Sequence, residues 1–213
     1  PKPGWVDHRV DDIRASVDKS IRGVLRKGVC KASEIAAIGI TNQRETALLW
    51  DRETGEALNN AVVWQCRRTT DFCEALKSRG HEKTVRRKAG LVLDPYFSAS
   101  KFRWLLHNTP GIRRKLDAGR VAAGTVDSYL VWQLTGGERH VTDVSNAART
   151  SLMNLKRLAW DSELAELFEV PLQLLPEIVP TSGLLGHTRG VRGLPDGIPI
   201  AGMAGDQQAA LFG

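Results

Sequence analysis

Disulfide chemistry and membrane insertion find little support in this chain of 213 residues. Its three cysteines, Cys30, Cys66 and Cys73, form neither an even set for disulfides nor a C-x-x-C spacing for a metal. We expect them to be reduced, with Cys66 and Cys73 buried on one face of a helix. No apolar stretch is long enough to span a membrane. Residues 1–7 lack the apolar core of a signal peptide, so we expect a cytoplasmic protein.

Aromatic residues are also scarce, at 6% of the chain, and none interleave with basic runs to form a base-stacking surface. The net charge of +6 includes short basic runs at residues 67–68, 86–88 and 113–115, which are typical of solvated helix faces. We therefore expect no nucleic-acid partner. The histidines lack metal-ligand spacing, and neither a P-loop nor G-x-G-x-x-G occurs. The sequence thus predicts no metal ligands and no cofactor-binding residues here.

The spacing of apolar residues predicts a mixture of helices and short strands. Helices are expected at residues 11–27, 70–79, 125–134 and 162–168, and strands at 35–40, 47–50, 61–64 and 198–203. Asp161 is the expected cap of the helix at 162–168. Residues 90–136 are expected to carry two or three helices, one capped by Ser98 or Ser100 and the next begun by Pro110. Prolines mark residues 171–199 as rich in loops.

These elements do not alternate strictly as in a series of βαβ units, so the sequence predicts an α/β chain with helical insertions. We find no internal repeat, low-complexity tract or flexible linker. The simplest organisation is one domain over residues 1–213.

Arg44 and Glu45 are expected where a buried strand ends, which is where open α/β sheets usually bind ligands. A guanidinium supplies fixed donors and a carboxylate supplies acceptors, so the pair suits two hydroxyls of a small polyol. The alternative is an internal ion pair that holds the turn.

Trp64 and Tyr96 each combine a flat apolar surface with one polar atom, which suits the carbon skeleton of a polyol. Packing in the core is the alternative for both. Asp206 lies between small residues after an apolar run, and Gln207 adds an amide beside it. A carboxylate there could accept a proton from an attacking hydroxyl, or could simply cap a helix.

Taken jointly, six blocks of the sequence resemble the glycerol kinases, a branch of the sugar-kinase family with an actin-like ATPase fold. They are PKPGWV at 1–6, IGITNQRET at 38–46, VWQCRR at 63–68, LDPYFS at 93–98, TD at 142–143 with NAART at 146–150, and AGDQQAALFG at 204–213. Six blocks in the family order are far more specific than any single motif. The resemblance implies a ribonuclease-H-like fold and favours the functional alternatives above.

The resemblance also implies a role for each candidate residue. Arg44, Glu45 and Tyr96 would bind glycerol hydroxyls, and Trp64 would pack against the carbon chain. Gln207 would assist them. Asp206 would be the general base for the hydroxyl that attacks the terminal phosphate of ATP.

Two departures from the family pattern shape the expected activity. The Asp-Gly-Thr-Thr phosphate hairpin and the second domain, which supplies the adenine site, have no counterpart in these 213 residues. We therefore expect an incomplete N-terminal, substrate-binding domain that lacks its first strands and is inactive alone. The complete enzyme would use ATP and Mg²⁺ and would be a homo-oligomer.

Two other functions remain open at this stage. The first is a related kinase for another polyol or a ketose sugar, which preferential turnover of a pentulose would favour. The second is a non-catalytic binding module, which would gain support if the intact gene product encoded neither the hairpin nor the second domain.

Overall fold

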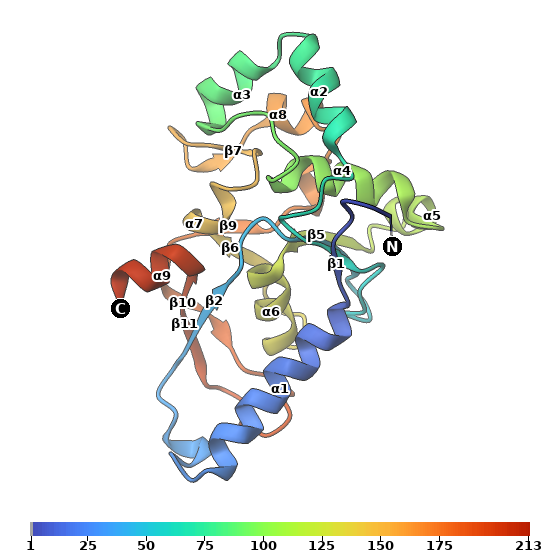
Figure 1. Cartoon of the computed structure of the whole chain (residues 1–213). Helices are drawn as coiled ribbons and strands as arrows, with labels where there is room; N and C mark the ends of the chain where they lie inside the picture. Colours follow the sequence, from blue (N-terminus) through green and yellow to red (C-terminus); the bar gives the residue numbers. More distant parts are fainter. Residues whose placement is uncertain (1) are drawn as a thin grey trace.

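The computed structural model describes residues 2–213, in which two sheets share the centre of the molecule with helices around them (Figure 1). The helices are α1 (Val10–Arg26), α2 (Thr70–Ser78), α3 (Glu82–Ala89), α4 (Ser98–Asn108), α5 (Ile112–Asp117), α6 (Val126–Leu134), α7 (Val144–Ala147), α8 (Ser162–Leu167) and α9 (Asp206–Phe212). The strands are β1 (Asp7–His8), β2 (Ile38–Asn42), β3 (Ala47–Asp51), β4 (Ala61–Val62), β5 (Val121–Thr125), β6 (Val141–Asp143), β7 (Met153–Asn154), β8 (Ala159–Trp160), β9 (Glu177–Val179), β10 (Ser182–His187) and β11 (Pro199–Gly205). Short 3₁₀ turns lie at Ala32–Glu34 and Leu172–Leu174.

The first sheet has the order β1-β4-β3-β5, and every residue of β3 and β5 is buried. Side chains of β3 alternate between two hydrophobic clusters, with Leu49 in one and Leu48 and Trp50 in the other. The cluster around Leu49 includes residues of α2, α3, α4 and α8, whereas the other includes Tyr129 and Trp132 of α6. Both faces of this sheet are therefore covered, which explains why residues 47–50 of β3 are all apolar.

The second sheet has the order β10-β11-β2, and its β2–β11 pair is parallel. The register pairs Met203 with Ile40 and Gly205 with Asn42. Parallel strands end at the same edge of a sheet, so the residues after Asn42 and those after Gly205 meet there. This pairing brings together segments that lie far apart in the sequence.

Several predicted elements are confirmed. The helices expected at 11–27, 70–79, 125–134 and 162–168 correspond to α1, α2, α6 and α8, and the strand expected at 198–203 corresponds to β11. Asp161 caps α8, because its side chain accepts hydrogen bonds from the backbone N–H groups of Glu163 and Leu164.

Residues 90–136 contain α4, α5 and α6, as expected, but also β5, which was missed. The Ala- and Gly-rich sequence of β5 is given strand structure by pairing with β3. Other predictions were wrong. Ser98 does not cap α4; its hydroxyl donates instead to the carbonyl of Glu45 at 3.1 Å. The next helix begins at Ile112 rather than at Pro110. Cys66 is buried but lies in the turn before α2, so it does not share a helix face with Cys73.

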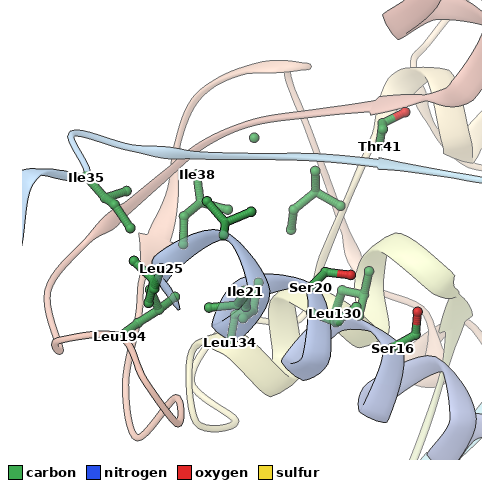
Figure 2. Close-up of a pocket in the computed structure, with 14 residues that line it drawn as sticks. Ser16, Ser20, Ile21, Leu25, Ile35, Ile38, Thr41, Leu130, Leu134 and Leu194 are labelled. Carbon is green, nitrogen blue, oxygen red and sulfur yellow. The ribbon is translucent and has the colours of Figure 1, made fainter. Parts of the chain in front are cut away.

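A cavity of about 480 Å³ separates α1 from β2 and α6 (Figure 2). Its walls are mostly aliphatic, including Ile21 and Leu25 of α1, Ile38 of β2 and Leu130 of α6. None of the six candidate site residues lines it. An aliphatic cavity offers few partners for hydroxyl groups, so it does not suit the polyol that the sequence analysis expects.

Candidate active site

The turn that follows β2 holds Arg44 and Glu45 in a strained conformation. Glu45 has a φ of +61°, and the N–H of Thr46 donates to the carbonyl of Arg44 at 2.7 Å. A three-residue turn of this kind is rare and costs about 1–3 kcal/mol. The strain is compatible with a functional role, because it directs two neighbouring charged side chains to different partners.

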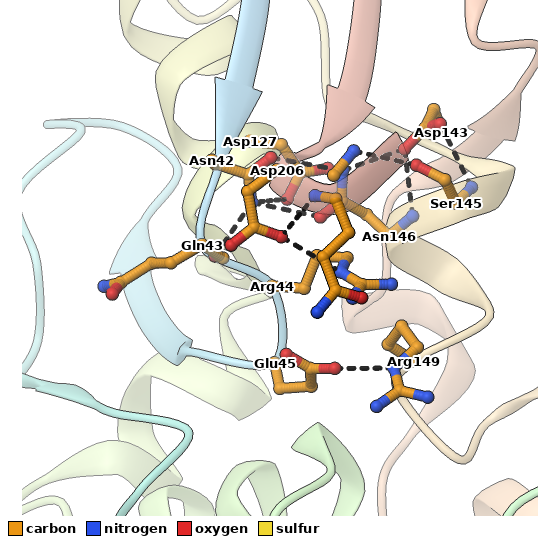
Figure 3. Close-up of polar contacts among 12 residues, drawn as sticks. Asn42, Gln43, Arg44, Glu45, Asp127, Asp143, Ser145, Asn146, Arg149 and Asp206 are labelled. Atoms are coloured by element: carbon orange, nitrogen blue, oxygen red, sulfur yellow. Dashed lines mark hydrogen bonds and ion pairs between the residues drawn. The ribbon is translucent and has the colours of Figure 1, made fainter. Parts of the chain in front are cut away.

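Arg44 lies beside the start of α9. Its Nε is 3.4 Å from a carboxylate oxygen of Asp206, and its Nη2 donates to the side-chain oxygen of Gln207 at 2.7 Å (Figure 3). The parallel pairing of β2 with β11 brings these groups together, since each follows the end of its strand. The acid and the guanidinium predicted as catalytic and substrate-binding groups are thus direct neighbours.

Glu45 is bound on its other side by Arg149, which follows α7. The Nε of Arg149 donates to the Glu45 carboxylate at 2.6 Å. The Arg149 guanidinium also lies over the rings of Tyr96 and Phe97, 5.6 Å and 4.9 Å from their centroids. Tyr96 in turn contacts Trp64, with ring centroids 5.4 Å apart. A continuous chain of contacts therefore joins the Glu45 carboxylate, through Arg149, to the rings of Tyr96 and Trp64.

Neighbouring side chains of the site differ strongly in their exposure to solvent. Arg44 and Glu45 are 5% and 2% exposed, whereas the side chain of Asp206 is 54% exposed. The Nε of Arg44 is buried and makes no hydrogen bond within residues 2–213, although it forms the ion pair with Asp206. A buried N–H without an acceptor is costly, so the described contacts leave this guanidinium incompletely paired.

A buried polar network lies behind the turn, on the side away from the solvent. The amide of Asn42, the last residue of β2, donates to the side-chain oxygen of Asn146 at 3.0 Å and approaches Asp127 at 3.5 Å. The hydroxyls of Thr125 and Thr142 also donate to Asp127. Complete burial raises the pKa of Asp127 to about 6, although both threonine hydrogen bonds favour its charged form.

The same network reaches the end of β11. Asp143 caps α7 through the N–H groups of Ser145 and Asn146, and it also accepts from the hydroxyl of Thr181. The N–H of Gly205 donates to the Ser145 hydroxyl at 2.9 Å. Hydrogen bonds therefore fix the ends of both parallel strands, just before the residues that carry Arg44 and Asp206.

The six residues predicted for the site are Arg44, Glu45, Trp64, Tyr96, Asp206 and Gln207, and they form two contact groups. Arg44 contacts Asp206 and Gln207, whereas Glu45 is linked through Arg149 to Tyr96 and Trp64. The two groups are joined because Arg44 and Glu45 are neighbours in the chain. Arg149 was missed, as was the network of Asn42, Asp127 and Asn146. A single Arg in a polar run of small residues at 145–150 is a weak signal, and nothing local in the sequence places it beside Glu45.

Residues 2–213 hold no group of three or more His, Cys, Asp or Glu side chains arranged to bind a metal ion. Within the same residues, no helix is both long and apolar enough to cross a bilayer. The site is therefore described by its hydrogen-bonding groups and its aromatic walls.

Comparison with known proteins assigns this architecture to a family. The family model described as "FGGY family of carbohydrate kinases, N-terminal domain" matches residues 1–213. The chain belongs to the FGGY family. A curated FGGY relative, the glycerol kinase of Bdellovibrio bacteriovorus, is 56% identical over all 213 residues, which cover 43% of the relative's length. The chain thus spans less than half of the relative it matches.

Solved structures confirm the predicted actin-like ATPase fold. The glycerol kinase of Plasmodium falciparum with ADP superposes with a TM-score of 0.89 at 35% identity, over 99% of this FGGY chain and 42% of that one. The gluconate kinase of Lactobacillus acidophilus gives a TM-score of 0.83 at 25% identity, over 96% of this chain and 40% of that one. The fold is therefore common to kinases named for different substrates.

Proposed function

We propose that this chain is the substrate-binding part of a glycerol kinase, which transfers the terminal phosphate of ATP to glycerol and yields glycerol 3-phosphate. One observation carries the proposal. A solvent-exposed carboxylate, Asp206, lies 3.4 Å from the buried guanidinium of Arg44, whose Nε donates no hydrogen bond to any of residues 2–213. The 56% identity to a curated glycerol kinase over the whole chain supports glycerol as the substrate.

In this proposal each residue has a separate task. Arg44 donates to one hydroxyl of glycerol, and Glu45 accepts from another. Tyr96 adds a third polar contact, and Trp64 packs against the carbon chain. Gln207 accepts a hydrogen bond from Arg44 and so orients its guanidinium. Because Glu45 and Arg44 are buried polar groups, a site that uses them to bind hydroxyls should discriminate against an analogue that lacks one.

Asp206 would act as the general base. As the attacking hydroxyl oxygen forms its bond to the terminal phosphorus, the bridging bond to ADP breaks and Asp206 takes the hydroxyl proton. A positioned base contributes about 10²- to 10⁴-fold to such a step. The exposure of Asp206 fits this role, because the base must be accessible to the attacking hydroxyl and the phosphate.

ATP and Mg²⁺ are the co-substrate and metal implied by the family. Residues 2–213 offer no cluster of carboxylates for the metal. We therefore assign to this chain the binding and deprotonation of the alcohol, and we expect residues 1–213 alone to be inactive. We also expect the complete enzyme to be a cytoplasmic homo-oligomer.

The alternative is a kinase for another polyol or sugar, and the similarity to a gluconate kinase structure favours keeping it. A non-catalytic binding module is the second alternative.

The steady-state ADP release of the complete protein, measured with glycerol, xylulose and gluconate, distinguishes these three functions. Glycerol should give the highest kcat/KM. Preference for xylulose or gluconate would transfer the assignment, and no turnover with any of them would favour a binding module.

The inactivity of the isolated segment is tested in the same assay. Residues 1–213, checked for folding by circular dichroism, should release no ADP with glycerol and ATP. Measurable turnover by the folded segment would contradict this assignment, because the segment would then bind the nucleotide as well as the alcohol.

A further inference from the structure

Lys101, in the first turn of α4, is a fully buried lysine that the roles above do not use. Its ammonium donates to the carbonyl of Pro95 at 2.6 Å, to that of Phe97 at 3.0 Å and to that of Tyr96 between them. The three N–H donors of the ammonium thus bind three consecutive carbonyls. These carbonyls belong to the segment that carries Tyr96 into the site.

The Lys101 ammonium does not pair with a carboxylate among the described residues. Lys101 forms no ion pair within residues 2–213, and the nearby acids Glu45 and Asp94 act on it only at longer range. Burying an unpaired ammonium is costly. A lysine without a specific contact would be more stable at the surface, where water solvates its ammonium. The contact with three carbonyls therefore serves to fix the segment at 95–97.

The first turn of α4 is bonded to three segments that carry residues of the site. The Ser98 hydroxyl donates to the carbonyl of Glu45 at 3.1 Å, and the N–H of Ala99 donates to the carbonyl of Thr150 at 2.8 Å, next to Arg149. Lys101 supplies the corresponding bonds to the Tyr96 segment. One helical turn therefore fixes the positions of Glu45, Arg149 and Tyr96 relative to one another.

We propose that Lys101 is a positioning residue for alcohol binding, whose ammonium fixes the Pro95–Phe97 segment and thereby the ring of Tyr96. The inference rests on the proposed function, since Tyr96 must contact the substrate for its position to matter. Asp94 holds the same segment from the other side, because its carboxylate accepts from the N–H of Tyr96 at 2.8 Å. Lys101 and Asp94 together fix both polar groups of the Tyr96 backbone.

This role gives alcohol binding a defined pH dependence. Burial lowers the pKa of Lys101 to about 7, even though the carboxylates of Glu45 and Asp94 favour its charged form; the thiols of Cys66 and Cys73 are the other ionisable groups around it. Burial also raises the pKa of the Cys73 thiol, so that thiol stays neutral through this range. Above pH 7 the amine has two N–H donors for three carbonyls, and the segment is held less firmly.

The test uses the complete kinase and two substitutions. Lys101→Met keeps the length of the side chain without its donors, and should raise the KM for glycerol about 10- to 100-fold, the cost of lost hydrogen bonds to a charged group. The kcat and the KM for ATP should change little. Lys77→Met is the matched control, because Lys77 pairs with Glu74 on the surface of α2 and does not touch the site; its glycerol KM should equal that of the wild type.

The pH profile separates positioning from simple structural support. The wild-type KM for glycerol should rise between pH 7 and 8.5, whereas that of Lys101→Met should be high and flat. A wild-type KM for Lys101→Met, or parallel pH profiles of the two proteins, would overturn the proposal. If the variant fails to unfold cooperatively, the wild-type profile decides alone, and a flat profile counts against Lys101. A wild-type enzyme that does not phosphorylate glycerol would instead refute the proposed function.

Discussion

Gly205 lies against the side chain of Arg44 with no room for a methyl group between them. A Cβ on Gly205 would come within 2.8 Å of Cγ of Arg44 and closer still to Cδ. Gly205 is the last residue of β11, and Arg44 follows β2, so the parallel pairing of these strands creates the close approach. The absence of a side chain at this position allows the guanidinium to reach Asp206 and Gln207.

Gly205→Ala should therefore displace Arg44 and weaken glycerol binding. A hydrogen bond to a charged group contributes about 1.5–3 kcal/mol, so we expect a loss of about 10- to 100-fold in affinity. Isothermal titration of the complete protein with glycerol measures it. The control is Gly202→Ala on the same strand, where a Cβ meets only the carbonyl of Thr181 at an ordinary 3.7 Å. Equal affinity of both variants would show that Arg44 does not need this space.

Asp206→Asn should reduce turnover far more than binding. The amide keeps the shape of the side chain but cannot take the proton of the attacking hydroxyl, so kcat should fall about 10²- to 10⁴-fold. The dissociation constant for glycerol should change little, and stopped-flow and titration measurements together test this. Equal losses in kcat and affinity would argue against a pure base role for Asp206.

Arg149→Met should raise the KM for glycerol about tenfold, because it leaves the buried carboxylate of Glu45 without its partner. It also removes the guanidinium from the face of Tyr96. Steady-state kinetics at saturating ATP measure the change. Arg157→Met is the control, since Arg157 also pairs with a buried carboxylate, that of Asp161, but contacts no residue of the site. An increase in KM of the same size in both variants would indicate a general loss of stability.

Asp127→Asn should remove a pH dependence of stability between about pH 4 and pH 6. The native pKa of Asp127 is raised to about 6 from an ordinary 3.8. The native state thus holds a proton that the unfolded state has lost, and the free energy of unfolding falls by about 3 kcal/mol as pH rises through this window. Denaturant unfolding of the complete protein at several pH values measures the slope, which Asp127→Asn should abolish.

Asp51→Asn provides the matched control for this slope. Burial opposes ionisation of Asp51, but hydrogen bonds from Lys115, the backbone of Glu53 and Arg120 outweigh it and lower the pKa to about 2. The stabilising contribution of Asp51 is therefore present above about pH 4 and is lost as pH falls toward 2. The slope between pH 4 and 6 should persist in Asp51→Asn. Its disappearance there would mean that another group causes it.

The sequence indicated which candidate residues follow strand ends, but it missed part of the sheets. Arg44, Glu45 and Asp206 stand next to strand ends that apolar runs reveal, and the family resemblance joined them with Trp64 and Tyr96. Strand β5 was missed because Ala122, Ala123 and Gly124 have little intrinsic preference for strands. Its extended structure depends on pairing with β3, which begins more than 70 residues earlier in the sequence.

By itself, the sequence determined the local elements and the chemical groups available to the site. The apolar periodicity of α1 and the cap at Asp161 act over a few residues, so they can be recognised without the fold. The tertiary structure alone decided which groups meet. Pairing β2 with β11 joins Arg44 to Gln207 across 163 positions. Packing of α7 against β6 and β11 brings Arg149 to Glu45 across 104. Contacts this distant arise from strand pairing and core packing, which no short pattern encodes.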